Sequence, residues 1–271
     1  MSSPELLSDF GAVDPEADVD RSVCASAGVR RVVLWDLPLR VFHWSLVAAV
    51  SVAIVTGELG GAWMPWHGRA GLVIVGLLVF RVLWGVVGSA TSRFAQFAPT
   101  PARLLAYLRG RWRGVGHDPL GALAVFALLG LLSLQAATGL FGNDDIAFAG
   151  PLNHLVDDAT GARATGWHRW LADGLIALVA LHLLAIAFHV IVKRHRLVRP
   201  MISGRHELEP GRDWPRPRGG GRFGLLSAVA VAATAVLALA GAGERPVPGA
   251  SLPAKPALVA APAGAASTPA W

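Results

Sequence analysis

Five long apolar stretches limit what this chain can fold into. They are Val41–Gly57, Gly68–Gly88, Pro119–Phe141, Trp170–Val192 and Phe223–Ala242. Each is close to the roughly 20 residues that an α-helix needs to cross a bilayer. The first is the shortest, and Leu37 and Leu39 can extend it. Only 15% of the 271 residues are charged, against about 25% in soluble domains. The sequence therefore predicts an all-α integral membrane protein with five spans.

The segments outside the spans predict the domain organisation. Residues 1–32 are acidic and contain proline, and no small-residue cleavage site follows the first span, so we expect a flexible cytoplasmic extension rather than a signal peptide. Residues 33–204 contain the first four spans, 205–222 form a basic cytoplasmic linker, and 223–243 contain the fifth span. The Pro- and Ala-rich residues 244–271 predict a disordered periplasmic tail, because this composition cannot build a packed core.

Positive charges gather on alternate loops. The net charge is +6, and Lys and Arg are dense between the second and third spans and between the fourth and fifth. The loop 58–66 has none, and the loop 142–166 has only Arg163 beside four aspartates. The positive-inside rule then places the N-terminus in the cytoplasm and the C-terminus outside. Aromatic belts agree, with Trp84 near the inner interface and four tryptophans at the outer one: Trp63, Trp66, Trp167 and Trp170. The charge thus indicates topology and contact with membrane lipid, not nucleic-acid binding.

Histidines within the spans are the candidate functional residues, because burying an ionisable group in a bilayer is costly. His168 and His182 lie fourteen residues apart. On a helix they face nearly the same side, about 21 Å apart along the axis. The span directions place His67 at the outer level with His168, and they allow His43 to share the inner level with His182. His189 is the rival inner ligand, since it lies on the same helical side as His182 at a depth that also suits His43.

Two imidazoles at each level fit haem iron better than zinc. Zinc sites usually bring three or four ligands together, often thiolates, whereas the single cysteine, Cys24, lies in the N-terminal extension. Asp173 points about 140° away from His168 on an ideal helix, so we expect it to contact a neighbouring helix. Haem iron takes two axial ligands, and the absence of a C-x-x-C-H motif excludes covalent c-type haem. Bis-imidazole ligation leaves no vacant axial position, which favours electron transfer over oxygen binding. Ligation by both His182 and His189 would bring two irons within about 10 Å, which favours His182 alone.

Two further residues have candidate roles near the histidines. Arg81 follows His67 by fourteen residues and repeats the spacing of the fourth span. It would pair with a haem propionate at the inner level, or else extend its guanidinium to the inner surface. Gly71 lies one turn after His67, where it would let a large ring approach the backbone or simply allow two helices to pack closely.

Several motifs together resemble the bacterial di-haem cytochrome b561 family, which includes the b-type cytochrome subunit of nickel-iron hydrogenases. The motifs are WDLPLRVFHW (Trp35–Trp44), HGRAG (His67–Gly71), FRVLWG (Phe80–Gly85), GHDPLG (Gly116–Gly121), Trp167-His168 and Leu181-His182. The resemblance implies a four-helix bundle in the bacterial inner membrane that holds two non-covalent b haems. By motif, His43 and His182 would bind the inner iron, and His67 and His168 the outer iron.

The resemblance also implies a function, to which there are alternatives. It implies electron transfer between a periplasmic redox partner, hydrogenase-like or cytochrome c-like, and membrane quinone bound near the inner haem. Such a relay subunit would complete an enzyme located elsewhere. One alternative is a superoxide:quinone oxidoreductase of the same family, although the acidic outer loops would repel an anion. Another is a haem-free transporter or scaffold. The fifth span and the tail depart from the family pattern and suggest a different or additional partner.

Overall fold

The computed structural model describes residues 30–112, 118–144, 148–194, 196–208 and 219–243. Five of its helices are long and apolar enough to cross a membrane: α2 (Leu37–Leu59), α3 (Met64–Val87), α6 (Pro119–Phe141), α7 (Asp158–Ile191) and α9 (Arg222–Gly243). The five predicted spans are therefore confirmed as helices. The expected N-terminal extension, except for its last residues, and the expected C-terminal tail lie outside the described residues.

Side-chain caps fix where three of these helices begin. The carboxylate of Asp36 accepts a hydrogen bond from Leu39 N (2.7 Å) at the start of α2. Asp118 caps α6 and Asp157 caps α7 in the same way. An acidic side chain that accepts from the first free amides of a helix stabilises that end by about 1 kcal/mol. The cap at Asp157 also explains why α7 begins well before its apolar stretch.

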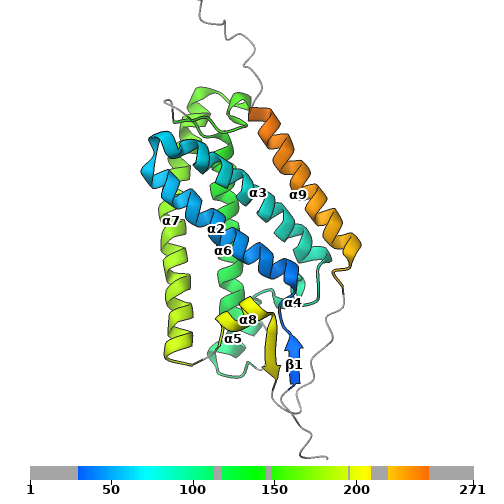
Figure 1. The fold of residues 1–271 in the computed structure, drawn as a ribbon. Helices are drawn as coiled ribbons and strands as arrows, with labels where there is room; N and C mark the ends of the chain where they lie inside the picture. Colours follow the sequence, from blue (N-terminus) through cyan, green and yellow to red (C-terminus); the bar gives the residue numbers. More distant parts are fainter. Residues whose placement is uncertain (1–29, 113–117, 145–147, 195, 209–218, 244–271) are drawn as a thin grey trace, which may run out of the picture.

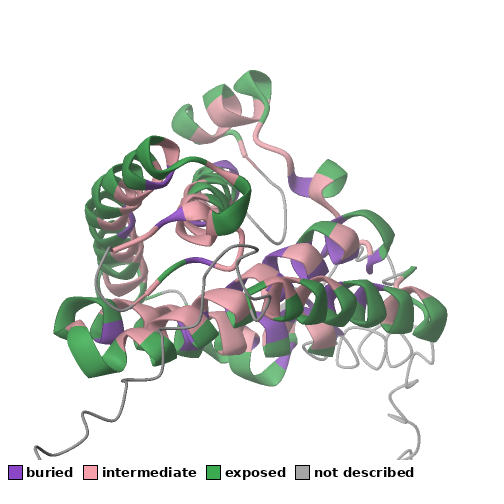
Figure 2. Cartoon of the chain, turned by 90° about the horizontal axis from the view of Figure 1, so that it is seen from above, coloured by how far each residue is buried: buried purple, intermediate pink, exposed green. Residues whose placement is uncertain are grey.

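The four helices of the predicted bundle form two antiparallel hairpins (Figure 1). One is α2 and α3, joined through the short helix η1 (Gly61–Trp63). The other is α6 and α7, joined by a loop that contains η2 (Asn153–Leu155). Contacts are far denser within each hairpin than between them, and the hairpins meet mainly through α3 and α6. Seen from above, the outward faces of these helices are exposed, as lipid-facing surfaces would be (Figure 2).

The fifth span packs along α3 rather than standing apart (Figure 1). Ala228 and Ala232 of α9 are buried, and a side chain at Gly76 of α3 would lie 2.7 Å from Val236 Cγ2. Small residues allow such close packing of membrane helices. The segment before α9 is also fixed to the end of α3, because Gly220 N donates to Val87 O (3.2 Å).

The end of the bundle where α2 begins carries structure that the hydropathy pattern does not predict. Strand β1 (Arg30–Val33) pairs antiparallel with β2 (Arg205–Leu208). The short helices at this end are α4 (Phe94–Phe97), α5 (Pro101–Leu108) and α8 (Val198–Ser203). The expected extension and linker boundaries therefore differ from the structure, since part of each forms this sheet. The pairing joins segments that are remote in sequence, which local patterns cannot reveal.

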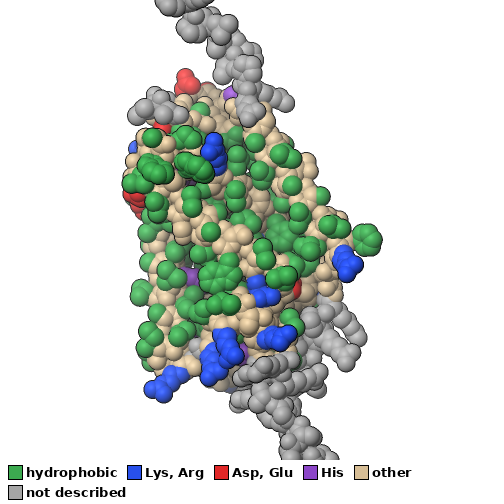
Figure 3. All heavy atoms as spheres, viewed as in Figure 1, with side chains coloured by type: hydrophobic (Ala, Val, Ile, Leu, Met, Phe, Trp, Pro, Cys, Tyr) green, Lys and Arg blue, Asp and Glu red, His purple; other side chains and the backbone are tan. Residues whose placement is uncertain are grey.

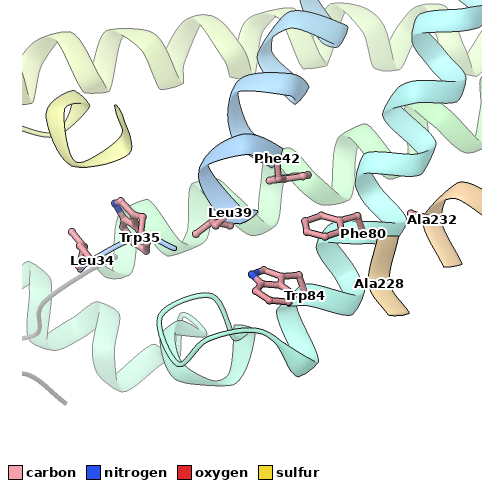
Figure 4. Close-up of a cluster of buried hydrophobic side chains, with 8 residues drawn as sticks. All are labelled: Leu34, Trp35, Leu39, Phe42, Phe80, Trp84, Ala228 and Ala232. Atoms are coloured by element: carbon pink, nitrogen blue, oxygen red, sulfur yellow. The ribbon is translucent and has the colours of Figure 1, made fainter. Parts of the chain in front are cut away.

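A buried cluster ties α2, α3 and α9 together near this end (Figure 4). It consists of Leu34, Trp35, Leu39, Phe42, Phe80, Trp84, Ala228 and Ala232. Trp84 stacks on Phe80 with ring centroids 6.0 Å apart. Trp84 is only 1% exposed, so its expected place in an aromatic belt is wrong. Its indole Nε1 instead donates to the Asp36 carboxylate (3.1 Å), a partner that lets a tryptophan be buried.

Charge divides the two ends of the molecule. On the visible face most Lys and Arg side chains gather at the end that holds β1 and α8, and acidic side chains appear toward the opposite end, with a hydrophobic band between (Figure 3). The end with β1 is called the basic end below, and the opposite end the acidic end. The chain is thus an integral membrane protein whose two ends differ in side-chain charge.

Candidate functional site

The structure brings His67 and His168 together at the acidic end of the bundle. Their ring centroids lie 5.9 Å apart and the ring planes are nearly perpendicular, at 85°. His67 comes from α3 and His168 from α7, so each hairpin contributes one ring. The predicted pairing of these two histidines at one level is therefore present in the fold.

A backbone carbonyl fixes the orientation of each ring. His67 Nδ1 donates to Ala53 O on α2 (2.8 Å), and His168 Nδ1 donates to Gln135 O on α6 (2.9 Å). A carbonyl can only accept, so Nδ1 carries the proton in both rings and Nε2 presents a lone pair. Metal-binding histidines are typically oriented by such a bond on the other nitrogen.

Glycines lie against both rings. A Cβ at Gly57 would be 3.0 Å from Nδ1 of His67, and a Cβ at Gly139 would be 2.9 Å from Cε1 of His168. These two positions therefore admit little more than hydrogen beside the imidazoles. By contrast, a Cβ at Gly71 would have no described atom within 4 Å, which agrees with open space beside the path of α3 after His67.

The spacing of the outer rings fits two ligands of one metal. A metal–imidazole bond is about 2 Å long, so rings on opposite sides of one metal have centroids roughly 6 Å apart. The observed 5.9 Å matches that separation. Among the described residues no cluster of three His, Cys, Asp or Glu side chains is placed to hold a metal ion. A pair of imidazoles, rather than a zinc-type cluster, is what the fold offers at this level.

The inner histidines are less closely held. His43 on α2 and His182 on α7 are both partly buried, and they lie near enough for the charge of one to act on the other. The ring of His43 meets Trp44 edge-on at 5.3 Å. Within the described part of the chain neither inner ring has a hydrogen bond. His189, the rival, instead has Nδ1 bonded to Ala185 O of its own helix (2.9 Å).

Arg81 is buried in the part of α3 that leads to the basic end. It is only 2% exposed, so its side chain does not extend to the surface. Its guanidinium carbon lies 4.2 Å from the centroid of the Phe94 ring, and its Nη1 is buried without a hydrogen-bond partner in the described structure. A buried cation with an unused donor is a suitable partner for an anionic group such as a propionate.

Asp36 organises the helix ends around Arg81, a role that was not predicted. Besides capping α2 and bonding Trp84, its carboxylate accepts hydrogen bonds from the hydroxyls of Ser89 and Ser92. The Asp36 charge also acts on Arg81. The signal in the sequence was the WDLP motif, in which an acidic residue precedes Leu-Pro at a helix start.

An apolar layer separates the two histidine levels. It is formed by Ala49, Ile74, Leu78, Leu132 and Leu175, which come from all four bundle helices. Leu175 is midway between His168 and His182 on α7, and Ile74 is midway between His67 and Arg81 on α3. The two histidine levels are thus separated by a buried apolar layer.

Asp173 and its neighbour Gly174 lie on α7 between the two histidines of that helix. Gly174 meets only Leu131 Cδ2, at 3.9 Å, which is ordinary helix packing. Asp173 is exposed, and its carboxylate makes no hydrogen bond or ion pair with the described residues. The expected contact of Asp173 with a neighbouring helix is therefore wrong, because α7 turns this face outward.

Known proteins resemble the chain over the region that holds these sites. A sequence model of the family described as prokaryotic cytochrome b561 matches residues 34–204. A protein of Bradyrhizobium diazoefficiens, named a probable Ni/Fe-hydrogenase B-type cytochrome subunit, is 26% identical, with 74% of this chain and 94% of that protein covered. One of Escherichia coli K12, named a probable Ni/Fe-hydrogenase 1 B-type cytochrome subunit, is 22% identical, with 63% and 88% covered. No solved structure matches the chain. The matched region includes His43, His67, His168 and His182 and ends before α9.

Proposed function

The chain belongs to the prokaryotic cytochrome b561 family, and from that premise we propose that it is a di-haem cytochrome b that relays electrons across the bacterial inner membrane. The relay would run between a hydrogenase-type redox partner on the periplasmic side and membrane quinone near the inner site. Relatives named as hydrogenase B-type cytochrome subunits support this choice of partner.

The observation that carries the proposal is the outer histidine pair. Each ring of His67 and His168 gives its Nδ1 proton to a backbone carbonyl of the adjacent helix and keeps Nε2 for a metal. Haem b supplies one-electron chemistry when it is bound. The chain supplies two imidazole rings at the separation expected for two ligands of one metal, and Gly57 and Gly139 allow the rings to lie close to the neighbouring helices.

For the inner site we propose His43 and His182 as ligands, with Arg81 as the partner of a propionate. The two histidines lie near enough for the charge of one to act on the other, which supports the pair. The unused Nη1 donor of Arg81 supports the propionate role, because an unpaired buried donor is costly. Gly71 would leave space for the outer ring system on α3.

The orientation in the membrane is part of the proposal. Basic side chains flank the short helices at the basic end, and the positive-inside rule assigns that end to the cytoplasm. The outer histidine pair then lies toward the periplasm, where a hydrogenase-type partner would deliver electrons.

The test is the haem content of single His→Ala variants purified in detergent. Wild-type protein should hold two haems per chain. His67→Ala and His168→Ala should each lose the same haem, and His43→Ala and His182→Ala should each lose the other. The pyridine haemochrome assay gives the ratio, and redox titration shows which of two potentials disappears.

Two results would change the assignment. Full haem content in His182→Ala, with loss in His189→Ala, would transfer the inner ligand role to His189. A wild-type protein that shows neither a Soret band nor a reduced α-band would be a haem-free transporter or scaffold, and the proposal would be wrong.

A further inference from the structure

The outer histidines contact two segments that repeat the same arrangement on different helices. The segments are Ala53–Gly57 of α2 and Gln135–Gly139 of α6, and both end in Thr-Gly. In each, the carbonyl of the first residue accepts from the histidine Nδ1, and the glycine four residues later lies against the same ring. We call these segments the Thr–Gly clamps.

The threonines bond to the carbonyls that the histidines use. Thr56 Oγ1 donates to Val52 O (2.6 Å) and approaches Ala53 O (3.3 Å). Thr138 Oγ1 lies 3.0 Å from both Leu134 O and Gln135 O. A threonine bonded to its preceding turn is common in membrane helices. Here each threonine also bonds to the carbonyl that accepts from a histidine, Ala53 O for Thr56 and Gln135 O for Thr138.

The glycines complete the clamp because a larger residue cannot take their place without moving the ring. A Cβ at Gly139 would lie 2.9 Å from Cε1 and 3.1 Å from Nδ1 of His168, and a Cβ at Gly57 would lie 3.0 Å from Nδ1 and 3.1 Å from Cε1 of His67. Carbonyl and glycine therefore fix both the rotation of the ring and its distance from the neighbouring helix.

We propose that the two Thr–Gly clamps are positioning elements that hold the outer imidazoles in one tautomer and one orientation, with Nε2 directed to the shared iron. This inference rests on the proposed function. The clamps are not equivalent: Thr138 Oγ1 also lies 3.3 Å from His168 Nδ1. Thr138 thus acts on both partners of the bond that sets the basicity of His168, and the electron density of an axial ligand is one means by which a protein tunes haem iron.

The experiment compares Gly139→Ala and Thr138→Val with Gly130→Ala as the matched control. Gly130 is on the same helix, and a Cβ there meets no described atom within 4 Å. In the di-haem protein we expect Gly139→Ala to change the low-spin ferric EPR signal of the outer haem, which depends on the angle between the imidazole planes. Haem affinity at that site should fall by roughly 10- to 100-fold, the usual effect of losing such orienting contacts.

Thr138→Val keeps the shape of the side chain and removes the hydroxyl, so it tests the inference even if Gly139→Ala folds poorly. We expect the midpoint potential of the outer haem to shift while that of the inner haem stays at the wild-type value. Wild-type outer EPR signal and potential in both variants would overturn the inference. If His67→Ala and His168→Ala still remove one haem, that result would leave the proposed function intact, so the two failures are distinguishable.

Discussion

The outer and inner histidine levels are built in different ways. At the outer level the backbone of a neighbouring helix holds each ring, through Ala53 O for His67 and Gln135 O for His168. At the inner level neither His43 nor His182 is hydrogen-bonded within the described chain. The polar interactions on that side of the bundle involve other residues, namely buried Arg81 and the hydrogen bonds to the Asp36 carboxylate. The two proposed metal sites thus share one type of ligand, but backbone geometry supports the outer one and side-chain charge the inner one.

This difference predicts which substitutions affect which site. Changes of side-chain charge should act at the inner level and leave the outer level unchanged, because backbone carbonyls cannot be mutated away.

Arg81→Leu should have the largest effect, and it should be confined to the inner haem. Without the buried guanidinium a propionate would lose its charged partner, so inner haem affinity should fall by about 10- to 100-fold. Haem-to-protein ratio and redox titration measure the loss. Arg69→Leu is the control, since Arg69 is exposed on the same helix. Equal weakening of both haems by Arg81→Leu would contradict the division between the levels.

Asp36→Ala should destabilise the basic end more than the loss of an ordinary cap. It removes the α2 cap, worth about 1 kcal/mol, and leaves donors of Trp84, Ser89 and Ser92 without their acceptor, at about 1–3 kcal/mol for each one that stays unsatisfied. Thermal unfolding in detergent measures the change. In Asp118→Ala the lost carboxylate caps α6 by a bond to Gly121 N (2.5 Å), so a smaller loss is expected. A fall in Tm that is equal in the two variants would show that Asp36 is only a cap.

Gly76→Leu tests whether α9 supports either level. The new side chain would meet Val236 of α9, and overpacking of this kind typically costs 1–3 kcal/mol, by rough estimate. We expect a lower Tm with both haems retained, because the α9 contact is on a different side of α3 from the histidine. Gly241→Leu, at a position in α9 with no described neighbour, should change little. Loss of a haem in Gly76→Leu would instead make α9 part of a site.

Asp157→Asn should give the smallest effect, and it should depend on pH. Hydrogen bonds from the backbone and hydroxyl of Thr160 hold the pKa of the Asp157 carboxyl below its ordinary value. A lowered folded-state pKa means that the ionised cap stabilises α7 above the ordinary carboxyl pKa, about 4, and that this contribution disappears as the pH falls further. A comparison of Tm at pH 6 and pH 3 should show a smaller pH dependence in Asp157→Asn. An identical pH dependence in wild type and variant would rule out this role.

Hydropathy predicts the spans, and the span directions predict the pairing of His67 with His168, because both can be inferred from composition along the chain. The features that they miss depend on contacts between remote segments. The residue type of Trp84 and its position near the end of a span predict an interfacial residue. Only the hydrogen bond to Asp36, which is distant in sequence, shows why Trp84 is buried. The strand pair of β1 and β2 joins segments that lie just outside the two ends of the matched residues 34–204. The Thr-Gly repeat at Thr56 and Thr138 is visible in the sequence, but its meaning requires the positions of the rings.

The apolar layer at Ile74 and Leu175 has a consequence for the energetics of the membrane. If each level carries a haem, an electron that moves between them crosses about 21 Å of a hydrocarbon core about 30 Å thick. Moving one charge through the full core against 100 mV is worth about 2.3 kcal/mol, so this step would sense roughly 1.6 kcal/mol. The transmembrane voltage would then shift the distribution of the electron between the two levels by somewhat more than tenfold for every 100 mV. The distance between the two levels would thus make the position of the electron sensitive to the membrane voltage.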